Sequence, residues 1–202
     1  MLRTLVKMSN ITNLSDARYC AGMGVEWLGF PMDDASFEKY REIRGWVSGV
    51  QVVGETESDD VAQITALSQQ FLPDYLQVTV PEILPSLSLL GLPLMLRIDV
   101  ASQSADEVAA TLTNHRAAVE YFLLESSDPF ARLDDAMLAW LDKLALRYPI
   151  LLGFGLREDT VAEVLDRVSV QGIALRGGDE LRPGYKDFGQ MMDLLERLDE
   201  ET

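Results

Sequence analysis

Three cations lie at the ends of short apolar segments in a chain that is otherwise strongly acidic. Lys7, Arg97 and Arg176 each lie at the end of such a segment, although the chain has 33 Asp and Glu residues against 17 Lys and Arg. A local binding site for an anion would explain cations at these positions. Alternatively, each cation pairs with a nearby carboxylate, because interior charges must be compensated with or without a ligand. The candidate carboxylates for such pairs are Asp99, Glu125 and Asp179.

Glu125 is the strongest candidate for acid-base chemistry. It directly follows an apolar segment that ends at Leu124. Partial burial at such a position raises the pKa of a carboxyl group, which allows it to donate a proton near neutral pH. A salt bridge from Glu125 to Lys7 or Arg97 is the competing interpretation, and the sequence does not decide between the two.

Glycines follow the last two apolar segments, at Gly153-Phe154-Gly155 and at Gly177-Gly178. The loops after the seventh and eighth strands of a barrel often bind phosphate through backbone amides, and glycine lets the backbone approach the ligand closely. Glycine also serves in turns with positive φ, which is the commoner explanation for an isolated pair. The joint placement favours a phosphate or anion site. Its predicted members are Lys7, Arg97, Gly155, Arg176, Gly177 and Gly178.

Other features limit the possible functions. The single cysteine, Cys20, falls on the apolar side of a predicted helix, so we expect a packed core residue and no nucleophile. One His and one Cys without clustered strand-end carboxylates predict no metal site, and nothing indicates a cofactor. The formal charge of −16 disfavours nucleic acid and anionic membranes as partners. A small anionic or phosphorylated metabolite remains the predicted partner.

The N-terminal residues lack the apolar core of a signal peptide, and no apolar run approaches the ~20 residues that a membrane helix needs. We therefore expect a cytoplasmic protein, either a monomer or a homodimer.

Eight apolar segments must position these polar residues. Most of them are apolar at nearly every position, which is typical of strands in a covered parallel sheet. They are residues 2–8, 26–30, 50–53, 75–80, 94–98, 119–124, 150–153 and 172–175. Segments with helical spacing separate them, at residues 14–23, 36–47, 58–70, 81–90, 105–113, 134–147, 159–168 and 187–198. Ser15 is the expected cap of the first helix, and Pro85 is expected to shorten or break the fourth.

Strict alternation of strands and helices predicts parallel strands with right-handed crossovers, in a closed barrel or an open doubly wound sheet. Eight repeats in 202 residues favour the closed form. We predict a single compact α/β domain over residues 1–202, a (β/α)8 TIM barrel. Ligands of such barrels bind at the carboxyl ends of the strands, where the candidate residues lie.

Several motifs carry a resemblance to a known family. The segment 7–12, Lys-Met-Ser-Asn-Ile-Thr, resembles the Lys-x-Cys-Gly-Ile-Thr opening of phosphoribosylanthranilate isomerases. Further matches are Asp16-Ala17-Arg18, Gly24, Leu28-Gly29-Phe30, Gln77 and the Leu123-Leu124-acid sequence. The tail, with Gly178-x-Glu180 and then Pro183-Gly184-x-Lys186-Asp187, resembles the family most specifically. The similarity spans nearly the whole chain.

The resemblance implies a (β/α)8 barrel that rearranges a phosphorylated aminoaldose to an aminoketose in tryptophan biosynthesis, without a cofactor. The family uses a cysteine base and an aspartate acid. By position these correspond to Ser9 and Glu125, so both catalytic residues are substituted. A serine hydroxyl is a poor base without a partner, whereas Glu125 retains the carboxyl group and adds one methylene.

Other positions also depart from the family. Asn10 replaces a glycine, Thr79 a histidine, Phe154 a glycine and Arg176 a serine, and the loop 31–35 lacks the family's arginine. Two functions are therefore open. The first is a divergent isomerase with Glu125 as acid and a base other than cysteine. The second is a catalytically inactive barrel that binds phosphate or a phosphorylated metabolite in a regulatory role.

Overall fold

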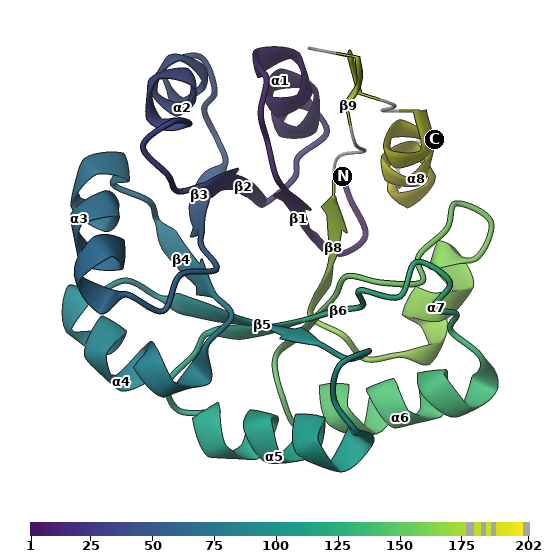
Figure 1. Cartoon of the computed structure of the whole chain (residues 1–202). Coiled ribbons are helices and arrows are strands. Elements are labelled where there is room, and N and C mark those ends of the chain that lie inside the picture. The colour runs from purple at the N-terminus through teal and green to yellow at the C-terminus, as the bar shows by residue number, and fades with distance from the viewer. Residues whose placement is uncertain (177–179, 183–184, 187–188, 200–202) are drawn as a thin grey trace.

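The computed structural model describes residues 1–176, 180–182, 185–186 and 189–199. Eight parallel strands pair in sequence order and close when β1 pairs with β8, and Figure 1 shows the helices as a ring around them. The predicted (β/α)8 barrel is therefore confirmed. The strands are β1 (Leu5–Ser9), β2 (Trp27–Pro31), β3 (Gln51–Glu55), β4 (Tyr75–Val78), β5 (Leu94–Asp99), β6 (Tyr121–Glu125), β7 (Ile150–Leu152) and β8 (Gly172–Arg176).

Every predicted helical segment contains a helix, with shifts of a few residues at the ends. The helices are α1 (Leu14–Gly22), α2 (Phe37–Arg44), α3 (Val61–Phe71), α4 (Leu84–Leu87), α5 (Ala105–His115), α6 (Asp135–Ala145), α7 (Val161–Arg167) and α8 (Gly189–Leu198). Helix α4 has only four residues, carries Pro85 in its first turn and lies between the 3-10 turns η1 (Pro81–Ile83) and η2 (Ser88–Leu90). The expected shortening at Pro85 is confirmed.

The predicted cap of α1 is wrong by two residues. Asn13, not Ser15, is the N-cap, and its side chain accepts a hydrogen bond from the backbone N–H of Asp16 at 2.9 Å. Asn and Ser are about equally good caps, so residue type alone does not separate the two positions. Asn13 has the extended backbone that a cap requires, whereas Ser15 already lies inside the helix.

A short antiparallel pair that the sequence analysis did not predict follows β8. It consists of β9 (Glu180–Arg182) and β10 (Tyr185–Lys186) and lies in the segment that carries the family-like tail. Gly177 and Gly178, both predicted to bind phosphate, lie outside the described residues.

Aromatic side chains close one end of the barrel interior. Trp27, Tyr75 and Tyr121 are the first residues of β2, β4 and β6, and the Trp27 ring meets the two tyrosine rings edge-on at 5.9 and 5.1 Å between centroids. Above them, Val53, Met95 and other apolar side chains fill the middle of the barrel. This packing leaves the opposite end, where the strands terminate, for polar residues.

Strand β3 is longer than predicted, and the difference bears on the site. The apolar pattern stops at Val53, but the strand continues because Glu55 pairs with Pro31 of β2 and with Gln77 of β4. Glu55 therefore ends a strand at the same edge of the sheet as Ser9 and Glu125.

Candidate active site at the mouth of the barrel

A pocket of about 330 Å³ opens at the carboxyl ends of the strands. Its lining includes Ser9, Glu55, Gln77, Arg97, Glu125 and Arg176, which come from six different strands. Four residues that the sequence analysis proposed for the site, Ser9, Arg97, Glu125 and Arg176, thus meet at one pocket.

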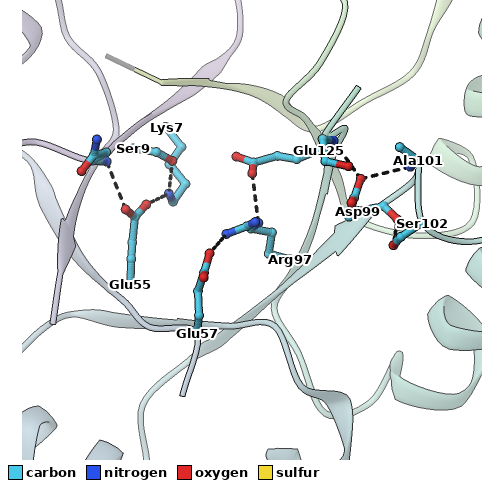
Figure 2. Close-up of polar contacts among 11 residues, drawn as sticks. Lys7, Ser9, Glu55, Glu57, Arg97, Asp99, Ala101, Ser102 and Glu125 are labelled. Carbon is cyan, nitrogen blue, oxygen red and sulfur yellow. Dashed lines mark hydrogen bonds and ion pairs between the residues drawn. The ribbon is translucent and has the colours of Figure 1, made fainter. Parts of the chain in front are cut away.

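Lys7 lies beneath this pocket and is fully buried. Its ammonium forms an ion pair with Glu55 and donates a hydrogen bond to the Ser9 hydroxyl at 2.7 Å (Figure 2). The expectation that a buried cation is paired holds for Lys7, but its partner is a residue that the sequence analysis did not name. The predicted third strand ended two residues too early to place Glu55 at the site. Direct contact between Lys7 and a ligand stays a prediction.

Gly29 provides the space for the Lys7–Glu55 pair. A Cβ atom on this residue of β2 would overlap the Glu55 carboxylate and would lie 3.0 Å from Nζ of Lys7. Because β2 lies between β1 and β3, the pair has to pass over the middle strand, and only a residue without a side chain leaves that path open.

The second oxygen of Glu55 is bound by the backbone. It accepts a hydrogen bond from the N–H of Asn10 at 3.0 Å, and Asn10 has φ of 58°. Glycine adopts this left-handed region without strain, and asparagine tolerates it better than most residues do. The family glycine at this position, and its replacement here by asparagine, both fit that backbone geometry.

Glu125 forms an ion pair with Arg97. Nε of Arg97 lies 3.0 Å from Oε2 of Glu125, while another nitrogen of the same guanidinium lies 2.7 Å from Glu57 at the exposed rim. The competing interpretation of Glu125, a salt bridge to Arg97, is therefore confirmed. Burial nevertheless raises the pKa of Glu125, against the opposing effect of Arg97, Lys7 and Arg176. The carboxyl group is thus biased toward its protonated form, as a proton donor requires.

Asp99, the other carboxylate at the end of β5, has a different role. It accepts hydrogen bonds from the backbone N–H groups of Ser127 at 2.9 Å and Ala101 at 3.0 Å. Although its partial burial acts in the opposite direction, these bonds lower the pKa of Asp99. Asp99 therefore anchors the loop after β6; the charge of Arg97 also lowers its pKa, but within the described residues it forms no ion pair with Lys7 or Arg97.

The glycines after β7 serve two purposes. A Cβ on Gly153 would lie 2.8 Å from Cγ of Glu125, so this glycine makes room for the acid. Gly155 has φ of 68° and lines a second pocket of about 440 Å³ together with Arg157 and Arg176. Arg176 lines both pockets and so connects them.

Gln77 carries an unsatisfied group into the first pocket. Its side chain is 4% exposed, and within the described residues its Oε1 has no hydrogen-bond partner. A buried acceptor without a partner is unfavourable unless a ligand satisfies it. The Oε1 of Gln77 is therefore a buried acceptor beside the pocket that no described residue satisfies.

Cys20 does not take part in this site. It is fully buried in α1, as predicted, and burial raises the pKa of its thiol to about 12. In the described part of the chain, no group of three or more His, Cys, Asp and Glu side chains is placed to hold a metal ion. The helices of that part are also too short or too polar to cross a membrane.

Known proteins of one family resemble this chain over its whole length. No family model matches the sequence. N-(5'-phosphoribosyl)anthranilate isomerase from Synechococcus sp. (strain JA-2-3B'a(2-13)) is 30% identical, over 98% of this chain and 91% of that protein. The solved structure of phosphoribosyl anthranilate isomerase from Thermotoga maritima superposes with a TM-score of 0.79 at 20% identity, covering 96% of this chain and 98% of that one.

A second solved isomerase holds reduced 1-(o-carboxyphenylamino)-1-deoxyribulose 5-phosphate. It superposes with a TM-score of 0.74 at 20% identity, again over 96% of this chain and 98% of that one. The structural matches support the barrel, and the sequence match to the curated relative, which covers nearly all of both chains, supports descent. With its substituted reacting residues, this chain therefore belongs to the N-(5'-phosphoribosyl)anthranilate isomerase family as a divergent member.

Proposed function

We propose that this protein isomerises N-(5'-phosphoribosyl)anthranilate to the corresponding aminoketose phosphate, as in tryptophan biosynthesis. One observation carries the proposal: the carboxyl group of Glu125, whose pKa is raised by burial, lines the pocket at the strand ends together with Ser9 and Gln77. Membership of the family adds the reaction and the substrate class.

Glu125 acts as the acid in this proposal. The reaction begins when a proton reaches the ring oxygen of the aminoaldose, the sugar ring opens, and the electron pair of the nitrogen forms a C=N bond at C1. A carboxyl group whose pKa is raised by burial suits the first of these steps. Ser9 takes the position of the family's cysteine and donates a hydrogen bond to the substrate from the opposite wall.

The phosphate of the substrate occupies the second pocket. Arg176 offers a charged donor there, and Gly155 brings the backbone close to the ligand. Gly177 and Gly178 complete this site in the proposal, since they directly follow Arg176 in the sequence. Lys7 and Arg97 contribute positive charge at the reacting end. The phosphorylated substrate is thus held at the end opposite to the one where its bonds change.

A direct assay tests this function. Purified protein is incubated with N-(5'-phosphoribosyl)anthranilate, and the aminoketose is measured by chromatography. In parallel, the gene is expressed in a tryptophan auxotroph that lacks its own isomerase. We expect turnover and growth with the natural sequence and a loss of at least ~100-fold in turnover for Glu125→Gln, which cannot donate the proton.

Absence of both turnover and growth would refute the isomerase function. If phosphate or the substrate then still raised the melting temperature of the protein, the regulatory binding role would replace it. A cytoplasmic location and a monomeric or homodimeric state are part of the proposal as well. Cell fractionation and light scattering of the purified protein test them.

A further inference from the structure

The geometry around Ser9 indicates that the serine is not the base of this site. Its hydroxyl oxygen accepts a hydrogen bond from the ammonium of Lys7 at 2.7 Å. With one lone pair of the oxygen occupied, the hydroxyl proton is free to point elsewhere, so Ser9 serves as a donor. Lys7 cannot remove that proton while it is itself a cation, and its ammonium is engaged in the ion pair with Glu55.

Carboxylates are the remaining candidates for a base in the described part of the pocket. They are Asp33, Glu55, Glu57 and Glu125. Asp33 is exposed, and its carboxylate caps the following turn through the N–H of Ser36 at 2.8 Å. Glu57 is 73% exposed and binds Arg97 at the rim.

Burial biases Glu125 toward its protonated form, and the proposed function already assigns it as the acid of the ring-opening step. Among these four, Glu55 is the carboxylate that is both largely buried and paired with a fully buried cation.

Two groups bind the carboxylate of Glu55. One oxygen meets the Lys7 ammonium and the other accepts the N–H of Asn10. A carboxylate offers about four acceptor positions, so these two bonds leave lone pairs for a substrate proton. The side chain is 12% exposed, which shields it from bulk water and still leaves it at the pocket wall.

Glu55 and Glu125 reach the pocket from different sides. They end β3 and β6, which lie across the barrel from each other, and Figure 2 shows the Glu55 carboxylate turned toward Lys7 and the Glu125 carboxyl group turned toward Arg97. Two carboxyl groups that reach one pocket from different strands, each with its own cationic partner, can serve as a base and acid pair.

We infer that Glu55 is the catalytic base of this protein, a role that rests on the proposed function and that replaces the missing cysteine. After ring opening, Glu55 takes the proton from C2 of the substrate. The C2–H electron pair forms a C1=C2 bond while the C=N pair returns to nitrogen. The resulting enol takes up a proton at C1 and loses its hydroxyl proton, which gives the ketone without any net oxidation.

The first test compares Glu55→Gln with Ser9→Ala and Glu57→Gln. We expect Glu55→Gln to lower kcat by ~100-fold or more, in the range found for loss of a general base, and to change KM little. Ser9→Ala should cost much less in kcat. Glu57→Gln is the matched control, because it also removes one carboxylate that contacts a cation near the pocket, but an exposed one. Glu55→Asp should restore part of the lost rate.

The second test separates a base from a residue that merely positions Lys7. The charged groups that face Glu55 are Lys7 on β1, Arg97 on β5 and Glu125 on β6. In Lys7→Met, Glu55 loses its ion-pair partner but the proposed base is still present, so we expect turnover to be reduced and not abolished. In the double variant Lys7→Met, Glu55→Gln, which leaves no unpaired charge, turnover should be absent at every pH.

The outcomes distinguish this inference from the proposed function. If the natural protein converts the substrate but Glu55→Gln retains more than a tenth of kcat, Glu55 is not the base and the isomerase function stands. If Lys7→Met and Glu55→Gln lose activity equally at every pH, Glu55 only positions the lysine. If Glu55→Gln fails to fold, the double variant decides. If the natural protein does not convert the substrate, both proposals are refuted.

Discussion

The guanidinium Nε of Arg97 lies 3.0 Å from a carboxylate oxygen of Glu125. Arg97 therefore opposes the burial that raises the pKa of Glu125. The proposed acid is active only while it is protonated, so its activity declines as pH rises through that pKa. The pair thus sets the upper pH limit of the reaction.

Replacement of Arg97 by methionine should move the alkaline limb of the kcat profile to higher pH. Without the guanidinium, burial raises the pKa of Glu125 further. Arg97→Lys, which retains a charge, should move the limb less. The measurement is kcat from pH 5 to 10 for the three proteins. An alkaline limb that stays in place or moves to lower pH would contradict the assignment of Glu125 as acid.

The buried carboxyl of Glu125 should also make stability depend on pH. Its pKa in the folded protein is raised above the ordinary value of 4.5, so the folded state binds this proton more tightly than the unfolded state does. Its contribution is fully present below pH 4.5 and is lost as pH rises through the folded-state pKa. Glu125→Gln lacks this dependence.

We expect the free energy of unfolding of the natural protein to fall, relative to that of Glu125→Gln, as pH rises from 4 to 8. Urea unfolding of both proteins across this range measures the difference. Parallel curves would show that the pKa of Glu125 is not raised.

Gly29→Ala should destabilise the protein by about 1–3 kcal/mol, the usual cost of overpacking. The added methyl group overlaps the Glu55 carboxylate and separates it from Lys7. Gly22→Ala is the matched control, because a Cβ on Gly22 meets nothing within 4 Å, and a small gain in stability is expected there. Thermal and urea unfolding measure both. Equal changes in stability for the two variants would mean that the Lys7–Glu55 pair does not need the space above Gly29.

Position 10 should accept glycine and reject branched residues. The left-handed backbone of Asn10 costs most residues about 1–2 kcal/mol. We expect Asn10→Gly to stay within about 0.5 kcal/mol of the natural protein, and Asn10→Val to lose stability and also kcat, because the N–H that binds Glu55 would shift. A fully stable and active Asn10→Val would contradict this account.

Gln77→Leu should separate binding from stability. The buried Oε1 of Gln77 has no partner within the described residues, so its removal should leave the melting temperature unchanged or higher. KM should rise about tenfold if the ligand donates a hydrogen bond to this oxygen, which corresponds to about 1.4 kcal/mol. Lower stability with an unchanged KM would show that Gln77 serves the fold instead.

The elements of the fold follow from the sequence because each strand is buried on both faces. An apolar run such as 119–124 then differs clearly from the amphipathic helices on either side. The same criterion fails where a strand becomes polar at its open end. Gly54 and Glu55 have no apolar signal, so only their pairing with β2 and β4 identifies them as part of β3.

Part of the site was predictable for the same reason, and part was not. Ser9 and Glu125 directly follow apolar runs and Arg97 lies near the end of one, so the pattern singles them out. The partner of Lys7 depends on which strands are neighbours and on a glycine between them, and neither can be read from local pattern. The sequence also offers too many acidic residues to identify Glu55 as the partner of Lys7. The chain has 33 Asp and Glu residues against 17 Lys and Arg, so every cation has several candidate partners.

Arg176 lines both the pocket that holds Glu125 and the pocket beside Gly155. A ligand that fills both pockets is bound at one end and reacts at the other. Binding free energy from a non-reacting group can then hold the reacting atoms in place, so its loss reduces the maximal rate and not only the affinity. A dephosphorylated substrate should accordingly remain slow even at saturating concentration, and inorganic phosphite added in trans should accelerate it.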